Sequence, residues 1–187
     1  MPETFAPVTL IEGVPGCGKT TVATALMVDA KAADPKLRLF CNYHLYGVPY
    51  IHWQVTDMLA YLNTGVVADG IMTVDESYIG MDCRAGSNPL TKMLTWFGMQ
   101  TRKRGIQLNV ISQHGRFIDW RIRFIMARRI VCSYDERTHM ESLLIHNVRR
   151  QTEKRVTFYA PRYWKYFNTN ELPEVPTEAI KRALAYA

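Results

Sequence analysis

The chain has 187 residues, of which 48% are hydrophobic and 21% are charged. These fractions are close to the averages of globular proteins, so they exclude a disordered or fibrous chain and predict a single domain spanning residues 1–187. The 23 lysines and arginines outnumber the 17 acidic residues, and the net charge of +6 suggests a polyanionic partner without identifying it.

Targeting signals and cysteines indicate the cellular compartment in which the protein is expected. No apolar stretch reaches the roughly 20 residues of a membrane-spanning helix, so we expect no membrane span in this chain. The first residues lack the basic start and apolar core of a signal peptide. The four cysteines are scattered without a CxxC motif, which predicts reduced thiols in a cytoplasmic compartment and no zinc site.

The amino-terminal part of the chain alternates between predicted strands and helices. Residues 8–11 form an apolar run that predicts a buried strand, and a glycine-rich turn leads from it into a helix that begins at about Lys19. The Asp-Pro dipeptide that follows ends this helix, because proline cannot continue it. A second strand is predicted over residues 37–41 and a loop over residues 42–52.

The alternation continues through the middle of the chain. Apolar residues at helical spacing predict a helix over residues 53–63, and residues 71–74 form a third apolar strand. A Ser-Asn-Pro sequence at residues 87–89 is typical of a helix start, and Gly105 closes that helix. Residues 106–112 predict a fourth strand.

The last part of the chain extends the pattern. A short helix is predicted over residues 118–127 and a fifth strand over residues 130–133, which together imply a mostly parallel sheet with helices on both faces. Residues 143–158 fit either a helix or a β-hairpin with a polar turn at residues 151–154, and we favour the hairpin. A terminal helix is predicted over residues 179–187.

The glycine-rich turn carries the strongest functional signal. It matches the phosphate-binding P-loop pattern in full, with a strand before it and a helix after it. Glycines let backbone N–H groups point at phosphate oxygens, Lys19 can reach the β- and γ-phosphates of ATP, and the Thr20 hydroxyl can ligate Mg²⁺. The predicted ATP-binding residues are Gly13, Val14, Pro15, Gly16, Cys17 (as a spacer), Gly18, Lys19, Thr20 and Thr21. The chain is therefore predicted to be an α/β P-loop NTPase, a three-layer α/β/α sandwich with a carboxyl-terminal β-hairpin and helix extension.

An acidic pair follows the third predicted strand. Asp75 can hold Mg²⁺ directly or through water, and Glu76 is the expected general base that activates the attacking water. An isolated Asp-Glu pair is usually a solvated loop, but its position after a buried strand in a P-loop protein favours the functional interpretation. Gln113, which follows the fourth strand, is either a strand-ending surface residue or a group that orients water and senses the γ-phosphate. The two preceding motifs favour the sensor.

The order of the P-loop, the acidic pair and the Gln113 strand resembles that of the FtsK–HerA superfamily of ATPases. The basic segment before Gly105, at residues 101–106, resembles viral and phage members. Residues 40–42 and residues 166–169 resemble the zonula occludens toxin-like proteins of filamentous phages. The resemblance covers roughly residues 8–170.

The resemblance implies a homo-oligomeric ring, a pentamer or hexamer, with ATP at the subunit interfaces. A neighbouring subunit would supply an arginine that stabilises charge developing on the γ-phosphate. We assign this catalytic role to Arg102 or Arg104, although the sequence alone does not choose among the basic residues of this region. The other candidates are Arg116, Arg121, Arg123, Arg128 and Arg129.

The function that the resemblance implies is a Mg²⁺-dependent ATPase that translocates viral double-stranded DNA into a preformed capsid. Its partners would be double-stranded DNA and the capsid or its portal vertex, in the host cytoplasm or on the virion. The first alternative is a filamentous-phage assembly ATPase, whose relatives usually carry a transmembrane helix. A small-molecule kinase and a non-enzymatic nucleotide-binding scaffold are further alternatives, and the acidic pair with Gln113 is less expected in such a kinase.

Basic residues with interleaved aromatics could contact DNA phosphates in the pore of such a ring. For residues 102–129, a DNA-facing surface and a solvated surface are equally compatible with the sequence. For residues 149–155 a solvated surface is favoured. The aromatic residues 159–167 could stack on single strands, but an edge strand or a subunit contact is favoured there.

Overall fold

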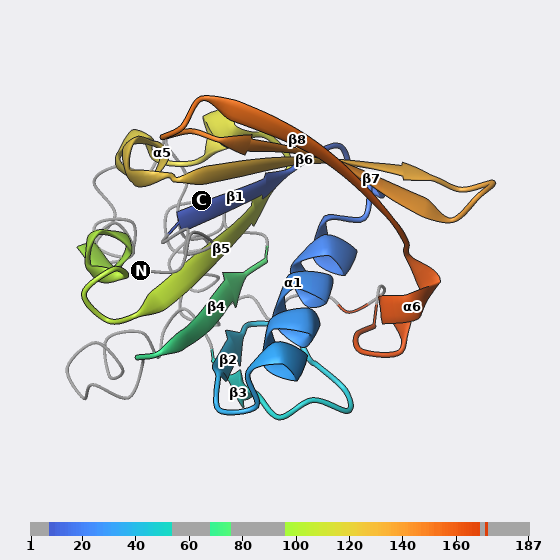
Figure 1. Ribbon diagram of the computed structural model, residues 1–187, viewed down its shortest axis with the longest axis horizontal. Coiled ribbons are helices and arrows are strands. Elements are labelled where there is room, and N and C mark those ends of the chain that lie inside the picture. Colours follow the sequence, from blue (N-terminus) through green and yellow to red (C-terminus); the bar gives the residue numbers. More distant parts are fainter. Residues whose placement is uncertain (1–7, 54–67, 76–95, 169–170, 172–187) are drawn as a thin grey trace, which may run out of the picture.

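The computed structural model describes residues 8–53, 68–75, 96–168 and 171. They build one mixed sheet in the strand order β3-β2-β4-β5-β1-β6-β7-β8 (Figure 1). The strands are β1 (Val8–Glu12), β2 (Arg38–Cys41), β3 (Ile51–His52), β4 (Gly70–Val74), β5 (Ile106–Ser112), β6 (Arg128–Asp135), β7 (Met140–Asn147) and β8 (Thr152–Tyr159).

The sheet is parallel from β3 through β6 and antiparallel in the final hairpin. Every pairing among β1 to β6 is parallel, whereas β7 pairs antiparallel with both β6 and β8. This confirms the predicted α/β fold and the choice of a hairpin over a helix for residues 143–158. The hairpin strands are longer than predicted because β7 pairs along its whole length with both neighbours, and the turn therefore lies at residues 148–151.

Helices lie on both sides of the sheet, as the alternating pattern predicted. The sequence places the first helix correctly, because glycines precede it and an Asp-Pro dipeptide follows it. Residues 96–100 are helical as well. The remaining helical elements are α1 (Lys19–Ala33), the 3-10 turn η3 (Gly115–Phe117), α5 (Trp120–Ile125) and α6 (Pro161–Trp164).

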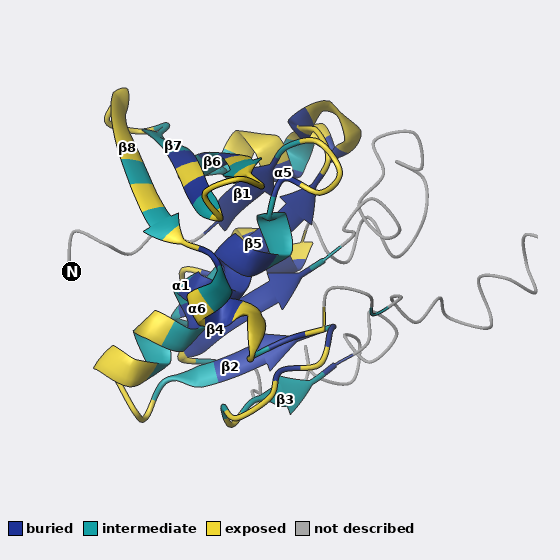
Figure 2. Cartoon of the chain, turned by 90° about the vertical axis from the view of Figure 1, so that its right-hand side faces the viewer, coloured by how far each residue is buried: buried dark blue, intermediate teal, exposed yellow. Residues whose placement is uncertain are grey.

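Successive side chains of the central strands point to opposite faces of the sheet, where they pack into two separate hydrophobic cores. On one face Ile11 packs in a buried cluster with Val22 of α1. On the opposite face the adjacent Leu10 packs with Phe97 and with Ile122 of α5. The central strands are accordingly buried, whereas β8 is mostly exposed (Figure 2).

Several predicted boundaries differ from the structure. The predicted loop over residues 42–52 contains the two-residue strand β3, which pairs with β2. The helix predicted over residues 118–127 spans only α5, because the Asp119 side chain accepts a hydrogen bond from the Arg121 backbone N–H (2.9 Å) and caps its start. The fifth strand extends from 130–133 to the whole of β6 because its partner β7 is equally long.

Three other predicted helices concern residues that are described only in part. Of the helix predicted over residues 53–63, only Trp53 lies within the described residues. The start of the helix expected after residues 87–89 and the terminal helix at 179–187 also lie outside them. The helical residues 96–100, which include the fully buried Phe97, lie within the predicted middle helix, but residues 101–105 form turns, so the helix ends before the predicted Gly105.

The parallel strands place the functional motifs along one edge of the sheet. Strands β1, β2, β4 and β5 run in the same direction, so the residues that follow them share the carboxyl edge. Gly13, Asn42, Asp75 and Gln113 follow these four strands directly. Ligands of open α/β sheets bind at this edge.

Candidate nucleotide-binding site

The P-loop connects β1 to α1 and holds its lysine over the curve of the loop. The Lys19 ammonium group donates to the carbonyl oxygens of Gly13 (2.9 Å) and Val14 (2.8 Å). The Gly18 backbone adopts φ = 80°, a left-handed conformation that suits glycine, immediately before the helix begins. The loop and the helix start therefore offer an ammonium group and backbone N–H groups to an anion.

The spacer residue Cys17 is buried beneath the loop. A Cβ atom at Gly13 would overlap the Cys17 sulfur, so the two residues fit only because position 13 is glycine. Burial raises the pKa of the Cys17 thiol above its ordinary value, which keeps the thiol protonated at neutral pH. These observations agree with a packing role for Cys17.

The acidic residue after β4 meets the hydroxyl residue of the P-loop. Thr20 Oγ1 donates a hydrogen bond to Asp75 Oδ2 at 2.7 Å. Asn42, which follows the adjacent strand β2, fixes the Asp75 backbone from the other side. Its side-chain amide donates to the Asp75 carbonyl (3.0 Å), and its carbonyl oxygen accepts from the Asp75 N–H (2.7 Å). Sequence reasoning noted Asn42 only as a family likeness and missed this positioning contact.

Thr20 and Asp75 fit the requirements of a Mg²⁺ site. Mg²⁺ prefers oxygen ligands and commonly takes one or two protein groups together with substrate phosphates and water. A hydroxyl and a carboxylate already in contact beside the P-loop match that pattern. Among the described residues there is no cluster of three or more His, Cys, Asp or Glu side chains that could hold a metal ion.

The structure describes the predicted sensor but not the predicted base. Glu76 lies outside the described residues, and its role stays a prediction. Gln113 is exposed and directly follows β5, whose last residue Ser112 pairs in register with Glu12, the residue before the P-loop. The structure therefore brings Gln113 to the correct edge of the sheet, while its function as a sensor remains a prediction.

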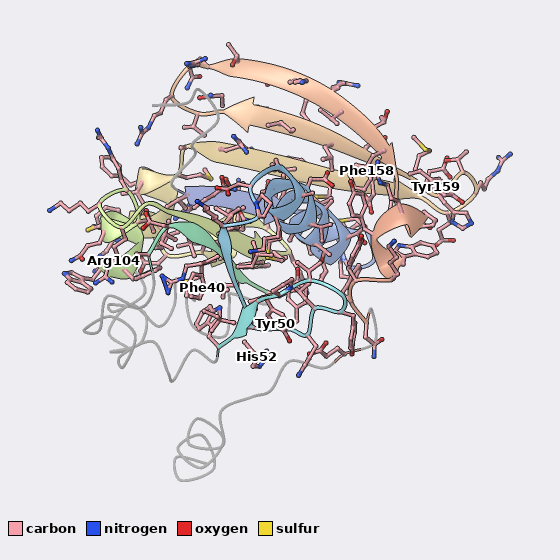
Figure 3. All side chains as sticks on the ribbon, turned by 60° about the horizontal axis from the view of Figure 1, so that its bottom comes forward. Phe40, Tyr50, His52, Arg104, Phe158 and Tyr159 are labelled. Atoms are coloured by element: carbon pink, nitrogen blue, oxygen red, sulfur yellow. The ribbon has the colours of Figure 1, made fainter. Side chains whose placement is uncertain are left out.

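Arg102 and Arg104 lie at the opposite edge of the sheet. They precede β5, whose seven residues at about 3.3 Å each separate them by about 20 Å from its carboxyl end. The Arg104 guanidinium group lies over the Phe97 ring, 6.0 Å from its centroid. Figure 3 shows Arg104 far from Tyr159, the last residue of β8. Within one subunit these arginines do not join the phosphate site, so the predicted role requires a neighbouring subunit.

Another candidate arginine is engaged inside the subunit. Arg129 on β6 forms an ion pair with Glu12, and its Nε donates to Glu12 Oε1 at 2.6 Å. The second Glu12 oxygen accepts from the Gly115 backbone N–H (2.6 Å). The buried Glu12 carboxylate thus joins β1, β6 and the segment after β5 just ahead of the P-loop.

A cavity of about 340 Å³ opens beside the phosphate site, a volume within the range of small-molecule pockets. It is lined by residues of the P-loop and α1, by Asn42 and Asp75, and by residues of the hairpin and of α6. The sequence did not predict the second half of this lining, because the hairpin and α6 lie far along the chain.

Glu141 on β7 is the most unusual residue of that cavity. Its side chain is fully buried, and neither carboxylate oxygen has a hydrogen-bond partner among the described residues. Burial raises its pKa to about 7. The carboxylate lies against Gly18, where a Cβ atom would overlap it. The sequence carries one sign of this burial. Glu141 lies two residues before the buried Leu143 on the same strand, so both side chains point to the same face of the sheet.

Comparison with protein-family models and with curated proteins gives no match. Solved structures do match. The N-terminal domain of zonular occludens toxin from Neisseria meningitidis is 17% identical, with a TM-score of 0.66 over 86% of this chain and 98% of that one. The genome packaging NTPase B204 from Sulfolobus turreted icosahedral virus 2, in complex with ATP-gammaS, is 12% identical, with a TM-score of 0.59 over 79% and 95%.

The likeness extends beyond viral and toxin proteins. A KaiC-like protein from Pyrococcus horikoshii OT3 is 15% identical, with a TM-score of 0.56 over 81% of this chain and 84% of that one. The chain has the fold of a P-loop NTPase. In the described part of the chain, no helix is long and apolar enough to cross a membrane.

Proposed function

We propose that this protein is a Mg²⁺-dependent ATPase that translocates viral double-stranded DNA into a preformed capsid. The observation that carries the proposal is the convergence of Lys19, Thr20 and Asp75 at one edge of the sheet. The fold likeness to a viral genome packaging NTPase in complex with ATP-gammaS supports the same class of motor. We further propose that the chain is a single domain of the FtsK–HerA type.

In the proposed reaction, water attacks the γ-phosphorus of ATP and the bond to the β-phosphate oxygen breaks. Mg²⁺ held by Thr20 and Asp75 would neutralise charge on the phosphates. Lys19 exchanges the Gly13 and Val14 carbonyls for phosphate oxygens. Glu76 takes the proton from the attacking water, and the products are ADP and inorganic phosphate.

The proposed assembly is a homo-oligomeric ring around DNA, at the capsid or portal vertex, in the host cytoplasm or on the virion. In this assembly Arg102 and Arg104 would act on the site of a neighbouring subunit, because they lie at the edge opposite their own P-loop. Hydrolysis would then alter subunit contacts and move the DNA-facing segments.

The likeness to the zonular occludens toxin domain favours one alternative, a filamentous-phage assembly ATPase. It shares the phosphate chemistry and differs in the work that hydrolysis drives. The two functions therefore separate on the nucleic acid partner and not on ATP binding.

ATP hydrolysis measured against increasing double-stranded and single-stranded DNA tests the proposal. We expect double strands to stimulate turnover more strongly. The Glu76→Gln variant should bind ATP and not hydrolyse it, because an amide cannot take the proton from water. Absence of hydrolysis with every nucleic acid would contradict an ATPase motor, and full turnover in Glu76→Gln would refute the assigned base. Preference for single strands would contradict packaging of double-stranded DNA.

A further inference from the structure

The cavity beside the phosphate site continues onto aromatic side chains that the proposed chemistry does not use. Tyr134 on β6 and Trp164 on α6 both line it. They meet through His139, in the turn between β6 and β7. The Tyr134 hydroxyl lies 2.7 Å from His139 Nδ1, and the His139 and Trp164 rings are edge to face at 5.6 Å. We call Tyr134, His139 and Trp164 the aromatic wall.

The aromatic wall is held in place by contacts outside the cavity. The Ala160 backbone N–H donates to the His139 carbonyl at 2.9 Å, which connects the start of α6 to the turn between β6 and β7. The Tyr163 hydroxyl donates to Asp29 of α1 at 2.8 Å, which ties α6 to the helix that follows the P-loop. A surface fixed before a ligand arrives loses less entropy on binding.

Between the P-loop and the aromatic wall lies the carboxyl group of Glu141, which has no hydrogen-bond partner among the residues that the structure describes. It contacts Gly18 on one side and is the cross-strand partner of Tyr134 on the other. Buried polar atoms in native proteins nearly always have partners, and leaving one unsatisfied destabilises the fold. A ligand that donates a hydrogen bond inside this cavity would satisfy Glu141.

We propose that the cavity is a nucleoside subsite, in which Glu141 accepts a hydrogen bond from a ribose hydroxyl and the base lies against Trp164 and Tyr134. The inference rests on the proposed function, because the phosphates must occupy the P-loop. The order in which phosphates, ribose and base are linked in a nucleotide decides which residue contacts which group. The ribose is attached to the phosphates and therefore reaches the carboxyl group that contacts the P-loop, and the base lies beyond it.

The test compares three ligands by isothermal titration calorimetry: ATP, 2′,3′-dideoxy-ATP and inorganic tripolyphosphate. Trp164→Ala should weaken ATP binding about tenfold, the range expected for loss of base stacking, and should leave tripolyphosphate binding unchanged. Trp96→Ala is the matched control, because Trp96 is similarly exposed (47% against 40%) and lies in the helical residues 96–100, outside the cavity.

Glu141→Met tests the ribose contact. The wild-type chain should bind ATP about fivefold more tightly than 2′,3′-dideoxy-ATP, because the dideoxy sugar lacks the donors. The variant should bind the two nucleotides equally, and circular dichroism confirms that it is folded. Equal affinity of the wild-type chain for both nucleotides would overturn the assignment of Glu141.

The outcomes separate this subsite from the proposed function. If Lys19→Ala leaves the binding of both ATP and tripolyphosphate intact, the phosphate site itself is wrong. If Lys19→Ala removes both, while Trp164→Ala weakens neither or weakens both equally, the nucleoside subsite is wrong and the ATPase proposal stands.

Discussion

At the scale of single residues, the P-loop depends on what surrounds it as well as on its own pattern. Gly18 and Gly16 have nearly the same positive φ angles, 80° and 77°. Their surroundings differ, because a Cβ atom at Gly18 would overlap the Glu141 carboxylate and one at Gly16 would meet nothing. The motif is thus constrained by the distant β7 as well as by phosphate.

This difference predicts unequal effects of two alanine substitutions. Gly16→Ala should destabilise the fold by about 1–2 kcal/mol, the strain of a left-handed non-glycine residue. Gly18→Ala should destabilise it more, because the same strain is joined by a clash with a buried carboxylate. Thermal unfolding of both variants measures the difference. Equal melting temperatures would contradict the placement of Glu141 against the loop.

Glu141 also predicts a pH dependence of stability. Burial raises its pKa from the ordinary value of about 4.5 to about 7 in the fold, where its charge acts on Cys17, Cys132 and Tyr134. The unfolded state therefore loses its proton first as pH rises, so stability falls from about pH 4.5 to about pH 7 and then levels off, by as much as about 3 kcal/mol.

Glu141→Gln should remove this contribution, because the amide does not ionise. The variant should gain stability over the wild-type chain at pH 8 and lose that advantage near pH 5, as measured by urea unfolding at both values. Glu136→Gln, at an exposed position in the turn before β7, is the control and should show no such crossover. A constant difference between wild type and Glu141→Gln at all pH values would refute the raised pKa.

At the scale of elements, local sequence patterns predicted the strands other than β3, and the first helix, because each carries its own signal. Apolar runs identify β1, β4 and β5, and the glycine and proline positions bound α1. The carboxyl edge that holds Asp75 and Gln113 followed from parallel pairing alone. The Glu141 contact could not be predicted, since it depends on the register of β7 against β6 and on the packing of that pair against the P-loop.

The same limit applies to Asn42, but not to Arg104. Asn42 reaches Asp75 because β2 and β4 are neighbours in the sheet, which sequence order does not reveal. Arg104 lies at the far edge because it precedes a parallel strand, and that could have been deduced from the predicted topology. The sequence therefore predicts most of the elements, but not the side-chain contacts between elements that lie far apart in the chain.

The ion pair between the buried Glu12 of β1 and the partly exposed Arg129 of β6 gives a prediction about element packing. Arg129→Met should destabilise the protein by about 2 kcal/mol, since it leaves the Glu12 carboxylate buried without its cation, and the partly exposed arginine moderates the loss. The double variant Glu12→Gln/Arg129→Met should recover part of that stability. Denaturant unfolding measures both, with the exposed Arg123→Met as control. A double variant no more stable than Arg129→Met would contradict the explanation.

At the scale of the whole molecule, the sheet separates the P-loop from the basic segment before β5. A ring with active sites shared between subunits is therefore testable by mixing two inactive variants. The Lys19→Ala variant lacks the phosphate-binding lysine. The Arg102→Ala/Arg104→Ala variant lacks the arginines proposed to stabilise charge on the γ-phosphate of a neighbouring subunit. Mixed rings contain interfaces with both parts intact, so ATPase activity should recover on mixing. No recovery at any mixing ratio would refute a role for these arginines in trans.

The outermost strand, β8, has a consequence for how copies of the chain meet. In the described part of the chain no strand lies beyond it, so one row of its backbone groups is open to pairing. The exposed Glu153, Lys154 and Arg155 place one negative and two positive side chains on that strand. Charged side chains on an edge discourage uncontrolled strand addition and the fibrils that follow from it. Copies of the chain at high concentration could thus contact one another through other faces without adding strands to this edge.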